Sequence, residues 1–130
     1  MASIFTKIIN GEIPCFKVAE NDTFFAFLDI NPLAKGHTLV VPKVEVDYIF
    51  DNDAATLSNI MIFSQKVAKA IEAVVPCERI GVAVLGLEVP HTHVHLVPIN
   101  SIGDLDFRKP RVVLSKEEMA ELADKIAAQL

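Results

Sequence analysis

The chain has 130 residues, and its 52% hydrophobic and 22% charged residues are typical of a folded domain and not of a disordered segment. This length suits one domain, so residues 1–130 are expected to form a single unit. The formal net charge of −5 argues against a nucleic-acid polymer as partner, although a small nucleotide can still bind. We find no signal peptide and no apolar run long enough to span a bilayer, which predicts a cytoplasmic protein with no membrane partner.

The predicted elements alternate in a way that favours an α+β fold. A short first helix is expected to end at the turn signal Asn10-Gly11. A long helix is capped by Asp51, Asn52 or Asp53 and runs to about Val75, before Pro76. A C-terminal helix opens on the capping-box pattern Ser115-Lys116-Glu117-Glu118. Strand-forming runs, mostly without intervening helices, predict about five strands in a mainly antiparallel sheet. These runs are Phe16–Ala19, Thr23–Leu28, His37–Val41, Ile80–Leu85 and His91–Ile99.

The long helix carries two adjacent apolar stripes. The first consists of Leu57, Ile60, Met61, Ser64, Ala68, Ile71 and Val75. The second consists of Phe63, Val67, Ala70 and Val74. Together they form an apolar arc wider than packing on one sheet requires, which either deep burial or a subunit interface explains. We predict a homodimer built partly on the second stripe, because apolar patches of this kind usually mark an interface.

Three of the four histidines fall at alternate positions, His91, His93 and His95. If this segment is a strand, the three rings lie on one face, and Thr92, Val94 and Leu96 on the other. A buried strand has no packing reason to gather three polar rings, because burying them is costly unless they are hydrogen-bonded. The pattern therefore leaves three interpretations: a metal site, a nucleophilic histidine with helpers, or core histidines with satisfied hydrogen bonds.

Three motifs together resemble one known family. They are the opening Ile4–Pro14, the segment Gly-His-Thr-Leu-Val-Val-Pro-Lys at 36–43, and the His-x-His-x-His run. In this order they are similar to the histidine-triad (HIT) family, close to its Hint branch. The resemblance implies a HIT-like α+β fold with one long helix and a C-terminal helix. It also implies a purine nucleoside monophosphate or a derivative as ligand, and homodimers with a sheet continuous across the two-fold axis.

The resemblance also assigns roles to particular residues. His93 would be the nucleophile in the hydrolysis of nucleoside phosphoramidates or related nucleotidyl bonds, forming a nucleotidyl-histidine intermediate. His91 and His95 would orient and polarise, and His37 would complete the proton network. Asp29 would bind the ribose hydroxyls in the nucleotide pocket; alternatively, it caps the turn before Asn31-Pro32.

The stretch before the triad departs from the family pattern. The residues Gly81–Pro90 form a shortened loop without the Asn and Gln that typical members carry. Glu88 stands at the nucleotide-binding position where a neutral phosphate-binding side chain is expected. A carboxylate there repels a phosphate unless it is protonated, turned away or paired with a histidine. A nucleotide-binding regulatory module with little or no turnover is therefore the alternative function, and the leaving group stays open.

No cofactor or metal is predicted. The family's optional zinc-binding Cys-x-x-Cys reads Ser3-Ile4-Phe5-Thr6 here. The three triad histidines with Glu88 offer four donors for a metal site, but alternate strand residues spread along roughly 13 Å of backbone. The basic run Arg108-Lys109-Pro110-Arg111 is expected to be a solvated loop, with a phosphate contact as its alternative.

Overall fold

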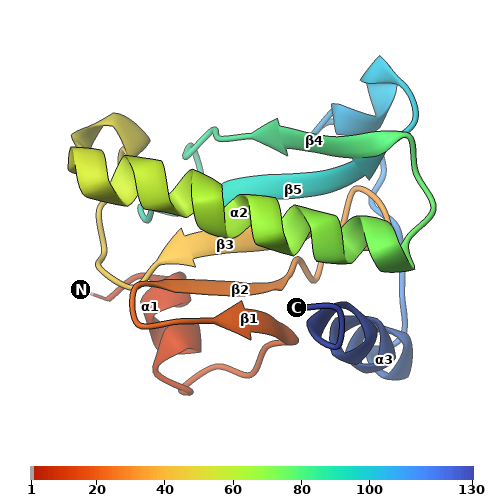
Figure 1. The fold of residues 1–130 in the computed structure, drawn as a ribbon, viewed down its shortest axis with the longest axis horizontal. Helices are drawn as coiled ribbons and strands as arrows, with labels where there is room; N and C mark the ends of the chain where they lie inside the picture. Colours follow the sequence, from red (N-terminus) through yellow and green to blue (C-terminus); the bar gives the residue numbers. More distant parts are fainter. Residues whose placement is uncertain (1) are drawn as a thin grey trace.

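A computed structural model describes residues 2–130, and it contains one five-stranded antiparallel sheet with helices packed on it (Figure 1). The strands are β1 (Lys17–Glu20), β2 (Phe24–Leu28), β3 (Thr38–Pro42), β4 (Arg79–Ala83) and β5 (Val94–Ile99). The helices are α1 (Ile4–Ile9), α2 (Ala54–Val74) and α3 (Lys116–Ala127), with 3-10 turns η1 (Ile49–Asp51) and η2 (Ile102–Leu105). The strand order is β1-β2-β3-β5-β4, which confirms the α+β prediction.

The two faces of the sheet have separate apolar clusters, because alternate side chains of a strand point to opposite faces. The larger cluster packs strand residues such as Leu28 and Val40 against α2 and α3, and α2 runs across the front of the sheet in Figure 1. The smaller cluster, on the other face, consists of Phe5, Phe25, Phe27, Leu39 and Val41. Phe5 belongs to α1, so this short helix helps to cover the second face.

Helix ends follow the capping signals. The Asp53 carboxylate accepts a hydrogen bond from the Thr56 amide and starts α2, and the helix stops two residues before Pro76. Ser115 and Glu118 form the predicted reciprocal capping box of α3. Within residues 2–130, no helix is both long enough and apolar enough to cross a membrane.

The triad segment is less regular than the sequence indicates. Strand β5 begins at Val94 and not at His91. The Thr92 amide and hydroxyl both donate to the Val46 carbonyl, and the His91 amide donates to the Val89 carbonyl. Because these backbone groups bond to loops and not to a neighbouring strand, His91 and His93 are outside the sheet ladder. The predicted strand therefore begins too early, but the three rings lie on one side of the segment as predicted, because Phe5 packs edge-on against both His91 and His93, and His93 packs against His95.

The second stripe of α2 is part of the core and not an exposed patch. Val67 and Ala70 are buried within this chain, and the half-buried Phe63 and Val74 pack against the same cluster. In contrast, Met61 of the first stripe is 48% exposed. The premise that a monomer leaves the second stripe uncovered is wrong, since α3 and the sheet already cover part of the wide arc.

Candidate functional site

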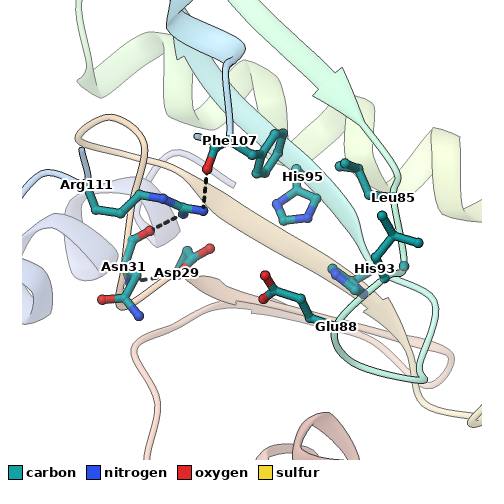
Figure 2. Close-up of a pocket in the computed structure, with 10 residues that line it drawn as sticks. Asp29, Asn31, Leu85, Glu88, His93, His95, Phe107 and Arg111 are labelled. Carbon is teal, nitrogen blue, oxygen red and sulfur yellow. Dashed lines mark hydrogen bonds between the residues drawn. The ribbon is translucent and has the colours of Figure 1, made fainter. Parts of the chain in front are cut away.

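An open pocket of about 560 Å³ lies where the β2–β3 turn, the loop after β4 and the start of β5 meet (Figure 2). The segment that follows η2 supplies its remaining wall. The lining residues are Asp29, Asn31, Leu85, Gly86, Leu87, Glu88, His93, His95, Phe107 and Arg111. Four of the predicted site residues line the pocket directly: Asp29, Glu88, His93 and His95. His37 lies behind this wall, and His91 points elsewhere.

His93 is held in one orientation by the backbone of its own segment. Its Nδ1 lies 2.7 Å from the His91 carbonyl oxygen. Because a carbonyl oxygen can only accept, Nδ1 carries the proton, and a neutral ring then has an unprotonated Nε2. The Phe5 ring packs edge-on against the imidazole at 4.9 Å between centroids. The Nε2 lone pair is therefore free and held in a fixed direction, as a nucleophilic histidine requires.

His95 and His37 form a hydrogen-bonded pair with a defined direction. The Leu33 amide donates to His37 Nδ1 at 3.0 Å, so the neutral His37 ring carries its proton on Nε2. That Nε2–H donates to His95 Nδ1 at 2.9 Å, and the neutral His95 ring therefore presents an Nε2–H donor. Burial lowers the pKa of His37 to about 3 and that of His95 to about 4, which keeps both rings neutral near pH 7.

Asp29 has both of the features that the sequence left as alternatives. One carboxylate oxygen accepts from the Asn31 amide at 2.8 Å, as in a turn cap. The other oxygen lies 3.6 Å from His37 Nε2, and the side chain lines the pocket. Burial raises the pKa of this carboxyl group above its usual value. Asp29 therefore offers an acceptor to the pocket while it fixes the turn.

His91 does not face the pocket. Its fully buried ring donates from Nε2 to the Pro42 carbonyl at 2.7 Å and accepts at Nδ1 from the Ser3 hydroxyl at 2.7 Å. Burial lowers the pKa of His91, in keeping with this neutral tautomer. The Glu45 carboxylate in turn accepts from the Ser3 amide and from the Thr6 hydroxyl. His91 thus acts on the site through its backbone carbonyl, which holds His93.

The pocket wall after η2 was missed by sequence reasoning. Arg111 donates to the carbonyl oxygens of Asn31 at 2.7 Å and Phe107 at 3.4 Å. Phe107 packs edge-on against His95 at 4.8 Å between centroids. The expectation of a solvated loop is right for Arg108, whose side chain is 91% exposed and pairs with Asp106. Arg111 is exposed too, but its side chain lines the pocket, where the alternative of a phosphate contact stays open.

Glu88 is exposed and lines the pocket beside His93 (Figure 2). Within residues 2–130, its carboxylate has no ion pair and no hydrogen bond to a histidine. The side chain is thus neither turned away nor paired with the triad. Any phosphate bound beside His93 experiences its charge.

The donor atoms offer two candidate metal arrangements. His91, His93, His95 and Glu88 do not converge on one point, because both His91 ring nitrogens are engaged elsewhere. Ligand atoms of Asp29, His37 and His95 do lie within 4.8 Å of one another. However, two nitrogens on one tetrahedral zinc are roughly 3.3 Å apart at zinc–nitrogen distances of about 2.0–2.1 Å. The observed 2.9 Å between His37 and His95 suits a hydrogen bond better.

Comparisons with known proteins identify the family and the fold. The HIT domain family matches residues 10–102. The adenosine 5'-monophosphoramidase hnt1 of Schizosaccharomyces pombe is 35% identical over 133 residues, covering 100% of this chain and 99% of that protein. A Hit-like protein from Bartonella henselae, described as involved in cell-cycle regulation and solved with an unknown ligand, has 34% identity and a TM-score of 0.84, covering 98% and 96% of the two chains. A zinc-bound histidine triad protein from Mycobacterium smegmatis has 26% identity and a TM-score of 0.82, covering 99% and 93%.

Proposed function

Because this chain belongs to the HIT domain family, we propose that it is a nucleotide hydrolase that cleaves purine nucleoside phosphoramidates through a nucleotidyl intermediate on His93. The observation that carries this proposal is the hydrogen bond from His93 Nδ1 to the His91 carbonyl, which leaves Nε2 free beside the pocket. The fission-yeast relative is named as a monophosphoramidase, which supports the choice of bond.

The first step forms a bond from His93 Nε2 to phosphorus and breaks the phosphorus–nitrogen bond. The leaving nitrogen takes a proton from solvent and departs as an amine. The His95 Nε2–H donates to a phosphoryl oxygen and stabilises the charge that develops there. Water then attacks phosphorus, His93 leaves as a neutral imidazole, and the water proton passes to solvent. The products are the amine and the nucleoside monophosphate.

Asp29 has the position to bind the sugar. Its carboxylate lines the pocket and is fixed by the Asn31 amide, so one oxygen remains to accept from ribose hydroxyl groups. The purine preference rests on the family resemblance and on the phosphoramidase relative, whose name specifies adenosine.

A turnover assay tests the proposal. Adenosine phosphoramidate and an adenylyl-lysine mimic are incubated with the protein, with and without a chelator. Hydrolysis that the chelator leaves unchanged is the expected result, because the histidine nucleophile needs no metal. Loss of turnover on chelation would favour a metal site such as the one offered by Asp29, His37 and His95.

One observation favours a second function, a nucleotide-binding regulatory module with little turnover. The unpaired Glu88 carboxylate lies in the same pocket as His93, where it opposes binding of an anionic phosphate. Binding of AMP without turnover of either substrate in the same assay would support this module and contradict the hydrolase.

The homodimer stays a proposal, with a different surface from the one that the sequence indicated. β4 is an edge strand, and Val82 on it is 49% exposed. Exposed edges offer unpaired backbone groups to a second chain. We propose that two copies pair through β4 and form one continuous sheet. The cytoplasmic location also stays a prediction.

A further inference from the structure

The single ring proton of His37 lies between two acceptors. The Leu33 amide donates to Nδ1, so in the neutral ring only Nε2 carries a proton. This Nε2 lies 2.9 Å from His95 Nδ1 and 3.6 Å from an oxygen of the Asp29 carboxylate. One N–H cannot donate fully to both atoms, so the carboxylate competes with His95 for this proton.

The Asp29 carboxylate has one oxygen to spare. Oδ1 accepts from the Asn31 amide, and within residues 2–130 the carboxylate has no second hydrogen bond. The oxygen near His37 is Oδ2. Burial raises the pKa of this carboxyl group, Arg111 lowers it and Glu88 raises it. The charge on Oδ2 is therefore costly while the pocket is empty, and a ligand that donates to Oδ2 relieves it.

His37 does not answer this charge by becoming a cation. Burial lowers the pKa of His37 to about 3, so the ring is neutral near pH 7. The contact with Asp29 is therefore one between a charged acceptor and a neutral N–H group. Its attraction draws the His37 proton away from His95 Nδ1.

The competition matters because His95 donates to the phosphoryl oxygen in the proposed reaction. Hydrogen bonds in a chain polarise one another, so a proton accepted at Nδ1 makes the Nε2–H of the same ring a stronger donor. Anything that weakens the bond from His37 to His95 therefore weakens the stabilisation of the phosphoryl charge. An unsatisfied Asp29 carboxylate has this effect.

The sugar of a bound nucleotide removes the competitor. Asp29 lines the pocket together with His95 (Figure 2), and its carboxylate has the position to accept from ribose hydroxyl groups. Hydroxyl groups that donate to Oδ2 satisfy that oxygen and reduce its pull on the His37 proton. The proton then bonds to His95 alone.

We infer that Asp29 and His37 form a sugar sensor, which makes turnover, and not only binding, depend on the 2'- and 3'-hydroxyl groups of the nucleotide. This inference rests on the proposed function and specifies ribonucleotides, as opposed to nucleotides without these hydroxyl groups, as the preferred substrates. Asp29 is a positioning residue in this role, because its effect on phosphorus passes through His37 and His95.

Two substrates with the same scissile bond test the sensor: adenosine 5'-phosphoramidate and its 2',3'-dideoxy analogue. For the wild type, the saturating rate kcat should be about tenfold lower for the dideoxy compound, the effect expected of one perturbed hydrogen bond. If Asp29 only held the sugar in place, loss of the hydroxyl groups would raise KM and leave kcat unchanged.

Asp29→Asn keeps an oxygen for the Asn31 amide and removes the charge. It should give equal kcat values for the two substrates and raise kcat for the dideoxy compound above that of the wild type. A variant that merely disturbed the site would lower both values. His37→Gln removes the shared proton and should also equalise the two substrates, at a lower rate.

Asp106→Asn is the matched control. Asp106 also accepts from the amide two residues ahead, that of Arg108, but it does not line the pocket. This variant should keep the wild-type ratio of the two kcat values.

Equal kcat values in the wild type would overturn the sensor and leave the proposed function intact. The same holds if the ratio persists in Asp29→Asn, or if this variant hydrolyses the dideoxy compound more slowly than the wild type. Hydrolysis of neither compound by the wild type would refute the proposed function and the sensor together.

Discussion

Ser3 fixes the orientation of the His91 ring, which does not line the pocket. Its hydroxyl donates to the buried Nδ1 of His91, while Nε2 of the same ring donates to Pro42. These two bonds fix the ring and, through it, the backbone carbonyl that holds His93. Ser3 is thus a positioning residue, and it is anchored by Glu45 through its own amide.

We predict that Ser3→Ala lowers kcat more than it raises KM, because the substrate does not touch Ser3 but His93 loses its fixed support. The buried Nδ1 of His91 also loses its donor, so the free energy of unfolding should fall by about 1–3 kcal/mol. Ser3→Thr keeps the hydroxyl and should restore most of both quantities. Steady-state kinetics and urea unfolding measure the two effects. A wild-type kcat in Ser3→Ala would show that Ser3 does not position His93.

Glu88 is predicted to oppose phosphate binding. Its carboxylate lines the pocket beside His93 without a partner, so Glu88→Gln should tighten AMP binding by up to about tenfold, or roughly 1.4 kcal/mol. Titration calorimetry at low salt measures the change. Glu78→Gln serves as control, because Glu78 is also exposed but does not line the pocket. Weaker binding in Glu88→Gln would mean that the carboxylate makes a favourable contact, as with a cationic amine or a histidine.

Sequence motifs predicted much of the site but not its far wall. His93 and His95 line the pocket and His37 supports it, as the motifs indicate. The hydrogen-bond partners of the His91 ring could not be predicted, because Ser3 and Pro42 are 88 and 49 residues away along the chain. Arg111 reaches Asn31 from 80 residues away along the chain, a contact with no local pattern.

At the level of the elements, boundaries were predicted best where a side chain caps a helix. Asp53 and Ser115 start α2 and α3 as their sequence patterns indicate. The strand after α2 was predicted to reach Leu85 but ends at Ala83, and the following loop contains Gly86 with a φ of 76°. The apolar residues of this loop have the composition of a strand, which explains the wrong boundary. In the structure, Leu85 and Leu87 are exposed and line the pocket.

The prediction about assembly concerns the edge strand β4. If two copies pair through β4, the wild type should sediment as a dimer at micromolar concentration. Val82→Lys should shift it to monomer, because a charge on an edge strand discourages pairing. Val113→Lys is the matched control, since Val113 is 92% exposed and lies in the segment before α3.

A wild-type protein that sediments as a monomer would contradict the dimer. A dimer that persists in Val82→Lys would instead place the interface on another surface. Val67→Asp is not a useful test of assembly, because Val67 is fully buried in this chain and a charge there would destabilise the fold itself.

For the whole molecule, the buried neutral histidines make stability depend on pH. The folded pKa values of His37 and His95, about 3 and 4, lie below the usual 6.5 of an unfolded chain. Below pH 6.5 the unfolded chain therefore binds more protons than the folded one. The free energy of unfolding should fall as pH decreases toward 5, by at most about 1.4 kcal/mol per pH unit for each histidine.

Urea unfolding at pH 7, 6 and 5 measures this slope. His37→Gln removes one of the two groups, so its stability should be lower at pH 7 but decline less steeply toward pH 5. The raised pKa of Asp29 acts in the opposite direction, because the folded protein then holds its proton to higher pH. Equal slopes in the wild type and in His37→Gln would show that His37 is not buried in its neutral form.

The central claim is that His93 carries the nucleotide during turnover. The direct measurement is a rapid alkaline quench of the wild type with adenosine phosphoramidate, followed by mass spectrometry of the peptides. We expect one adenylyl group on the peptide that contains His93, and none in His93→Ala, which should lose turnover while binding AMP within about tenfold of the wild type. Turnover in His93→Ala near the wild-type rate, or an adenylyl group on another residue, would contradict the account.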